Sequence, residues 1–325
     1  RWSASGMAFA IGPALGLNRD VHKRGLCVAP RCSDKAGLYR RNRERMSPEE
    51  YNSWRQDIRK RSRAIPLVVD YDPIDVVYED DELIAVAKPA DLKVHPAHRF
   101  VGGTLINRVN GYLGYPPKTL HRLDQSTSGV VLMGKRKGPA LSEISRSFRD
   151  KEVTKEYLAV VEDHEGLYEK QSLVVDAPIC RDDRELFMRK VGWDGPEAKE
   201  GKTRIDFLDR VGKVALVRAV PITGRTHQIR LHLQHIGCPI LGDPAYGFLG
   251  PWTTTGECQV RVSLHLHAWK LHFPHPCTGQ RTTATAEPPE NFQATANYFN
   301  LTLASGSLED ASQLTSTVPT LRYEA

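Results

Sequence analysis

The middle of the chain alternates short apolar runs with polar turns, and this pattern predicts a β-rich domain. From Leu67 onward, the apolar runs have the length and alternation of strands. The predicted strands cover residues 76–78, 83–87, 157–161, 203–208, 214–220 and 260–273. An acidic turn, residues 79–82, lies between the first two runs and predicts that they form a hairpin.

Two segments of the same region have helical spacing. Residues 141–148 fit a helix throughout. Residues 228–236 first alternate like a strand and then fit a helix, and we predict a helix of about three turns there. Residues 65–300 are therefore predicted to form one α+β domain, in which helices flank a mixed, mostly antiparallel sheet.

A short amphipathic helix is predicted at residues 47–64, ahead of this domain. Ser47 and Glu50 have the spacing of a capping box, and Pro48 suits the first helical turn. Three apolar side chains would share one face of this helix: Tyr51, Trp54 and Ile58. The opposite face is basic, and we expect it to be solvated; contact with RNA is the alternative.

Both ends of the chain lack a periodic pattern. Residues 1–46 are rich in arginine and poor in acids, which is typical of an organelle transit peptide. We therefore expect a plastid or mitochondrial location; the alternative is a disordered basic arm on a cytoplasmic or nuclear protein. Ser, Thr, Leu and acids dominate near the other end, so residues 301–325 are predicted to be a disordered tail.

Charge and composition narrow the possible functions. The 325 residues carry a net charge of +6, of which residues 1–64 contribute +9 and the remainder −3, so bulk charge does not explain ligand binding by the main domain. No run approaches the ~20 apolar residues of a membrane-spanning helix. The six cysteines include no C-x-x-C pair, which indicates reduced thiols in an intracellular compartment.

The densest polar cluster in an apolar setting is residues 121–129. Asp124 lies two residues from Arg122, so both side chains would share one face of an extended segment, where the cation favours the ionised carboxylate. An ionised carboxylate at the mouth of a buried strand suits a nucleophile or a base. The alternative is an Arg–Asp pair that only fixes a loop, and this segment taken alone favours that alternative.

Two further segments carry candidate chemistry. Tyr157 places an aromatic hydroxyl on a predicted strand, although a half-buried tyrosine in a sheet is the simpler interpretation. A short donor-rich segment contains Arg225, His227, Gln228, Arg230 and His232. Such a segment suits contacts to phosphate and carboxylate groups, and a polar helix face is the alternative.

These segments belong to a set of motifs in a fixed order. The motifs are Tyr78-Glu79-Asp80-Asp81-x-Leu83-Ile84-x-Val86-x-Lys88-Pro89, His121-Arg122-Leu123-Asp124-x-x-Thr127-Ser128-Gly129, Lys155-Glu156-Tyr157-Leu158-Ala159-Val160, Ile222-Thr223-Gly224-Arg225-Thr226-His227-Gln228-Ile229-Arg230 through Asp243, and Leu264-His265-x-His267-Ala268. In this order they resemble the RluA family of pseudouridine synthases, over residues 76–292. One departure lies after Pro89, where the family usually has a glycine two residues on and this chain has Asp91.

The resemblance implies a single pseudouridine synthase catalytic domain with its cleft across the sheet. It implies isomerisation of specific uridines in rRNA or tRNA by base flipping, without cofactor or metal. Asp124 matches the family's nucleophile or base, Tyr157 the residue that stacks on the base, and Arg225 the partner of the carboxylate. Further residues are expected to bind the substrate: Arg122, which would hold the flipped nucleotide, and His121, Thr127, Ser128 and Arg230. We expect RNA as the partner and a monomer without membrane contact.

Other functions were weighed against this one. His265 and His267 share one strand face and could be zinc ligands, but the Leu/His alternation also fits a half-buried strand and no cysteine knuckle accompanies it. A Gly-x-Ser-x-Gly motif is absent from the sequence, so a serine hydrolase has no nucleophile elbow. A catalytically silent RNA-binding or assembly factor on the same scaffold is the second hypothesis; the presence of Asp124, Tyr157 and Arg225 favours an active enzyme.

Overall fold

The computed structural model describes residues 45–163, 166, 172–183, 188–247, 263–303 and 318–323, apart from the side chains of residues 59, 62 and 63. The chain divides into two compact units, Arg1–Ala64 and Ile65–Ala325. The predicted transit peptide falls almost entirely outside the described residues. None of the described helices is both long and apolar enough to cross a lipid bilayer.

The first unit contains helix α2 (Pro48–Ala64). Its start has the predicted capping box, because the Ser47 amide donates to Glu50 Oε2 at 2.9 Å and the Glu50 amide donates to Ser47 Oγ at 3.2 Å. These two bonds satisfy backbone donors that the first helical turn leaves unpaired. The prediction of a helix at residues 47–64 is thus confirmed.

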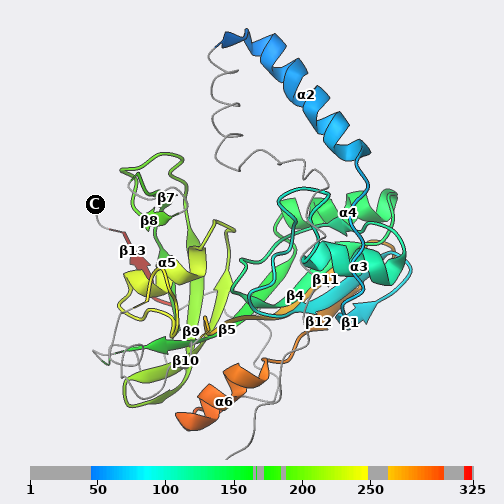
Figure 1. Cartoon of the computed structure of the whole chain (residues 1–325). Coiled ribbons are helices and arrows are strands. Elements are labelled where there is room, and N and C mark those ends of the chain that lie inside the picture. The colour runs from blue at the N-terminus through cyan, green and yellow to red at the C-terminus, as the bar shows by residue number, and fades with distance from the viewer. Residues whose placement is uncertain are drawn as a thin grey trace, which may run out of the picture. The chain divides into compact units, whose positions relative to one another are not determined.

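An eleven-stranded sheet forms the second unit (Figure 1). Its main path runs β1-β2-β4-β11-β5-β10-β9-β6-β13, and β3 and β12 pair with β4 and β11. The bounds are β1 (Asp75–Glu79), β2 (Leu83–Lys88), β3 (Lys118–Thr119), β4 (Ser128–Gly134), β5 (Thr154–Glu162), β6 (Ser172–Asp176), β9 (Lys202–Val211), β10 (Val214–Pro221), β11 (Leu266–Pro274), β12 (Arg281–Thr285) and β13 (Thr320–Arg322). Only β4–β11 and β6–β13 pair in parallel, so the sheet is mixed and mostly antiparallel as predicted. A separate small hairpin joins β7 (Ile179–Arg181) and β8 (Arg189–Val191).

Four helices cover this sheet: α3 (Leu105–Leu113), α4 (Pro139–Arg149), α5 (Gln228–His235) and α6 (Glu290–Tyr298). On β5, Ala159 and Val161 pack with residues of α5, whereas Leu158 and Val160 pack with residues of α6. The alternation of side chains along a strand therefore places α5 and α6 on opposite faces of the sheet. Residues 228–236, whose pattern fitted both a strand and a helix, form α5.

Tyr157 lies at the centre of the sheet, between two apolar cores. Its ring packs against the core that contains α5 and against the core that contains α3. Across the strands it aligns with Ala268 of β11 and Ala219 of β10, and Ala268 in turn pairs with Gly129 of β4. A Cβ at Gly129 would lie 2.1 Å from the Ala268 carbonyl oxygen, and its φ is +114°, so this crossing requires glycine.

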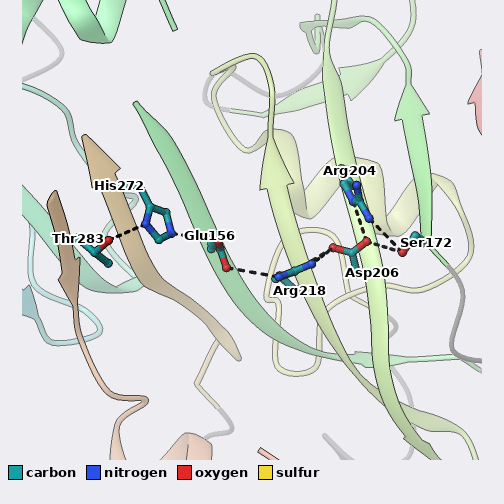
Figure 2. A network of polar contacts seen from close by, with 7 residues as sticks. All are labelled: Glu156, Ser172, Arg204, Asp206, Arg218, His272 and Thr283. Atoms are coloured by element: carbon teal, nitrogen blue, oxygen red, sulfur yellow. Dashed lines mark hydrogen bonds and ion pairs between the residues drawn. The ribbon is translucent and has the colours of Figure 1, made fainter. Parts of the chain in front are cut away.

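A buried polar ladder runs across β11, β5, β10 and β9 of the sheet (Figure 2). Glu156 Oε1 lies 3.0 Å from His272 Nε2, and Glu156 Oε2 lies 3.8 Å from Arg218 Nη1. Arg218 and Arg204 both donate to Asp206, at 2.9 and 2.8 Å. Each carboxylate of the ladder therefore has an arginine or histidine beside it in a region from which water is largely excluded.

The structure differs from the sequence predictions at three places. Residues 318–323, part of the predicted disordered tail, include strand β13, which pairs with β6 and satisfies its backbone groups; residues 304–317 lie outside the described residues. Leu301 is buried, so the domain also extends past residue 300. The predicted strand 260–273 begins only at Leu266, and residues 260–262 lie outside the described residues.

Asp91, at the family's glycine position, adopts φ +63°, a conformation that aspartate tolerates better than most residues.

Candidate active site

A cleft of about 1260 Å³ opens on the Tyr157 face of the sheet. Asp124 reaches it from the loop between β3 and β4, and Tyr157 from β5. Arg225, His227 and Arg230 reach it from the end of β10 and from α5. Segments separated by a hundred residues therefore supply one site, and the sheet brings them together.

The lining of this cleft is strongly basic. It contains nine cationic residues: Arg122, Arg149, Lys151, Lys155, Lys202, Arg204, Arg225, Arg230 and Arg281. Asp124 and Glu152 are the two carboxylates among its lining residues. Although residues 65–325 carry a net charge of −3, the fold concentrates positive charge where a polyanion would enter.

Asp124 lines this basic cleft, with its side chain 31% exposed. Its Oδ2 atom is 3.7 Å from Arg230 Nη1 and 3.8 Å from His227 Nε2. Its backbone carbonyl accepts a hydrogen bond from the Thr127 amide at 3.2 Å, which closes the turn that presents it. The carboxylate is thus oriented by two neighbours and still open to a ligand.

Arg230 is a fixed cation. Its Nε and Nη2 donate to the two oxygens of Asp243 at 2.7 and 2.6 Å, a bidentate geometry that sets the plane of the guanidinium. The guanidinium also lies over the Tyr246 ring, 4.8 Å from its centroid. Burial would lower the pKa of Arg230, but the hydrogen bond and charge of Asp243 and the charge of Asp124 raise it further. Nη1 therefore remains a charged donor aimed at Asp124.

His227 is held by a second tyrosine contact. The Tyr246 oxygen accepts a hydrogen bond from the Arg189 amide at 3.0 Å and lies 2.8 Å from His227 Nδ1, and we expect its own proton to be donated to that nitrogen. The remaining proton of a neutral imidazole then sits on Nε2, facing Asp124. Burial lowers the pKa of His227; the charge of Asp124 opposes this only in part, and the charge of Arg230 lowers the pKa further. His227 is therefore a neutral donor near pH 7.

Tyr157 presents a half-buried ring beside the carboxylate. Burial and the negative charge of Asp124 raise the pKa of Tyr157, so the phenol stays protonated. No hydrogen bond of its hydroxyl is formed within the described residues. The ring packs against apolar side chains on both sides and is therefore rigid, which suits a stacking surface for a flat ligand.

Lys88 fixes the loop that carries Asp124. It is 1% exposed and donates from Nζ to the carbonyls of Pro89, Leu92 and Gln125 at 2.8, 2.8 and 2.9 Å. Burial lowers the pKa of Lys88 to about 8, against the opposing charges of Asp91 and Asp124. Because Gln125 follows Asp124 directly, this ammonium group positions the carboxylate through the backbone.

The predicted pairing of Arg225 with Asp124 is wrong. Arg225 Nε donates to the Glu200 carbonyl at 2.8 Å, and its guanidinium makes no ion pair with Asp124. Arg230, expected to bind substrate, makes the pair instead. Arg225 precedes α5, whereas Arg230 lies on the helix and faces the β3–β4 loop. The spacing of the two arginines in the sequence does not show which of them faces Asp124.

The other predicted residues have different environments. Arg122 is exposed, lines the cleft and makes no ion pair with Asp124, so the loop-fixing pair also is not formed. His121 lines the cleft, but its Nε2 accepts from the Leu132 amide at 2.9 Å. Thr127 lines the cleft and is buried. Ser128 does not line it; its hydroxyl lies 2.9 Å from His267 Nδ1, so this geometry does not support the expected substrate contact.

Four contributors were missed as site residues: Lys88, His227, Asp243 and Tyr246. Lys88 could have been found from the sequence, because it ends the apolar run 83–88 and a charge in a buried strand needs fixed polar partners. His227 was noted only within a donor-rich segment and Asp243 only as the end of a motif, and Tyr246 lies outside the motifs. The roles of Asp243 and Tyr246 depend on the return of the chain after α5.

The histidine-rich strand has structural partners. His265 Nε2 lies 2.8 Å from Thr295 Oγ1, and His267 Nε2 lies 2.8 Å from the Ala286 carbonyl oxygen. These contacts connect β11 to α6 and to the segment before it. Within the described ranges, no group of three or more His, Cys, Asp or Glu side chains is arranged to hold a metal ion.

Comparisons with known proteins identify the family of this chain's relatives. A family model described as RNA pseudouridylate synthase matches residues 82–235. An "uncharacterized RNA pseudouridine synthase" of Aquifex aeolicus is 33% identical, over 70% of this chain and 73% of the relative. A "ribosomal large subunit pseudouridine synthase D" of Nitrosomonas europaea is 36% identical, over 68% of this chain and 64% of the relative. The solved structure of human RNA pseudouridylate synthase domain containing 1 superposes with a TM-score of 0.56 at 26% identity, over 68% of this chain and 85% of that one.

Proposed function

This chain belongs to the RluA family of RNA pseudouridine synthases, and we propose that Asp124 is the carboxylate through which it isomerises a uridine in structured RNA. The family reaction converts uridine to pseudouridine within RNA, so the enzyme is an isomerase. The observation that carries the proposal is the placement of Asp124 in a basic cleft, beside a flat ring and a fixed guanidinium.

The chemistry requires a carboxylate but no second reactant. The N1–C1′ bond breaks with its electron pair on the uracil, the base turns, C5 bonds to C1′, and the proton lost from C5 is balanced by one gained at N1. Asp124 is placed to act on this centre as nucleophile or as base. Arg230 and His227 both approach Oδ2, so they orient the carboxylate toward the cleft.

Tyr157 serves as the platform for the flipped base. A uridine inside an RNA stack is out of reach of a side chain, so the base must be extruded at a cost of a few kcal/mol. Stacking on an aromatic ring recovers ~1–3 kcal/mol of that cost. The rigid Tyr157 ring next to Asp124 suits this role, and the exposed Arg122 at the same cleft suits a contact that holds the nucleotide out of its helix.

We propose ribosomal RNA as the first substrate class to examine, with transfer RNA as the second. Support comes from the relatives, two of which are named ribosomal large subunit pseudouridine synthases D and C, in Nitrosomonas europaea and Vibrio cholerae. The nine cations of the cleft suit a polyanion of either kind.

A comparison of Asp124→Asn with the native enzyme tests the proposal. Tritium release from RNA carrying 5-³H-uridine measures bond exchange at C5. The RNA is taken from cells that lack the protein. We expect Asp124→Asn to bind RNA like the native enzyme and to release no tritium above background. The matched control is Asp81→Asn, an exposed aspartate outside the cleft, which should keep full activity.

Equal release by the native enzyme and Asp124→Asn would exclude Asp124 as the catalyst. RNA binding without any tritium release by the native enzyme would favour the catalytically silent RNA-binding factor instead.

A further inference from the structure

Lys155 is a cation without an anionic partner. It lies on β5, lines the cleft and is half-buried; burial lowers its pKa, with no opposing charge. Its Nζ atom is 5.4 Å from the centroid of the Phe148 ring. Within the part of the chain that the structure describes, it makes neither an ion pair nor a side-chain hydrogen bond.

Other buried cations of the domain have partners. Arg218 and Arg230 are held by carboxylates at 2.9 Å or less, and Lys88 by three carbonyls. A withdrawn cation without an anion lowers stability, because it loses hydration and gains no opposite charge. The absence of an anionic partner for Lys155 is therefore best explained if the bound ligand supplies the anion.

The position of Lys155 on its strand indicates what that anion is. Lys155 and Tyr157 are two residues apart on β5, about 6.6 Å along the strand, and both line the cleft. This spacing is comparable with the distance from a nucleobase to a phosphate of its own nucleotide. Three further cations line the same cleft: Arg149, Lys151 and Arg281.

We propose that Lys155 binds a phosphodiester group of the RNA beside the nucleotide whose base stacks on Tyr157. The inference rests on the proposed function, since it takes the stacked base as its reference point. An ammonium on a flexible stem suits a phosphate as a point charge. The ammonium lies over the Phe148 ring, and His121 stacks on that ring, so aromatic side chains of the cleft lining limit where the lysine can move.

Binding of single-stranded heptauridylate, a defined probe that needs no duplex opening, tests this site. The dissociation constant is measured by fluorescence anisotropy between 50 and 300 mM salt for the native chain, Lys155→Met and Lys155→Arg. Each phosphate contact contributes about 0.7 to the slope of log affinity against log salt for a single strand. We expect Lys155→Met to bind about three- to tenfold more weakly at 50 mM salt and to lose about 0.7 of that slope.

Two control variants distinguish the effect of the charge at position 155 from the effect of a charge elsewhere on the protein. Lys155→Arg keeps the cation and should keep most of the slope. Lys137→Met removes one charge at an exposed position outside the cleft, and its slope should stay close to the native value. Thermal unfolding shows whether each variant is folded before it is scored.

The proposal is overturned if Lys155→Met binds the probe with native affinity and slope, or if Lys155→Arg weakens binding as much with no change of slope, which would indicate a packing role. Absence of salt-dependent binding by the native chain would also reject it. The readout is binding and needs no turnover, so its result is separate from that of the tritium-release assay for Asp124.

Discussion

Arg230 approaches Asp124 with a single nitrogen, Nη1, at 3.7 Å, because its other two nitrogens are bound to Asp243. The buried carboxylate of Asp243 therefore fixes the orientation of the guanidinium. The remaining guanidinium nitrogen faces the partly exposed carboxylate of Asp124. Because only one guanidinium nitrogen approaches Asp124, its carboxylate keeps lone pairs free for a substrate atom. A guanidinium bound to Asp124 in a bidentate manner would have occupied both oxygens.

The first prediction concerns the identity of the cation that supports Asp124. Arg230→Lys should lower kcat by about 100-fold, because a flexible ammonium cannot bind Asp243 and reach Asp124 in the same geometry. Arg225→Lys is the matched control, and its kcat should change less than threefold. Single-turnover tritium release at saturating RNA measures both. Similar losses for the two variants would contradict the assignment of this role to Arg230.

The second prediction concerns the proton of His227. With the Tyr246 hydroxyl donating to Nδ1, ¹⁵N chemical shifts of the imidazole should show the proton on Nε2 at pH 7. Tyr246→Phe removes that donor and should give a mixture of tautomers and a kcat about tenfold lower. An Nδ1 proton in the native enzyme would refute the proposed orientation.

A third prediction concerns Lys88 as a positioning residue. Lys88→Met leaves the Gln125 carbonyl without its donor and should lower kcat about 10- to 100-fold through misplacement of Asp124. The affinity for heptauridylate should remain near the native value, because Lys88 does not line the cleft. Lys137→Met serves as the control of equal charge. A loss of affinity with unchanged kcat would show that Lys88 acts on RNA binding.

The fourth prediction concerns acid stability and the polar ladder (Figure 2). Burial would raise the pKa of Glu156, but the hydrogen bond with His272 and the charge of Arg218 lower it below the ordinary 4.5. Its stabilising contribution is therefore complete above pH 4.5 and is lost as pH falls through the lowered value. Glu156→Gln should unfold about 2 kcal/mol more easily at pH 7, and the difference from the native chain should shrink below about pH 4.

Urea unfolding at pH 7 and pH 3.5 measures this difference. Glu152→Gln, which changes an exposed glutamate of the neighbouring loop, should show no more than a few tenths of a kcal/mol at either pH. A Glu156→Gln penalty that does not vary with pH would mean that the ionised carboxylate is not what stabilises the ladder.

Much of the fold and of the site follows from local pattern. The hairpin at residues 75–88, the strands that became β5, β9 and β10, and the capping box of α2 depend on side chains close together in sequence, where alternation and spacing are informative. The motif around Asp124 and the position of Tyr157 on its strand were likewise visible, because each lies within one segment.

The tertiary structure decided which side chains meet. Pairing of Asp124 with Arg230 and not with Arg225, fixation of Arg230 by Asp243, and the parallel pairing of β13 with β6 all join segments whose distance in sequence carries no geometric information. The basic cleft is a further case, since net charge counts residues and the electrostatic field depends on where they lie. Local preference is an additive property of neighbouring residues, whereas contacts between distant segments depend on the packing of the whole chain.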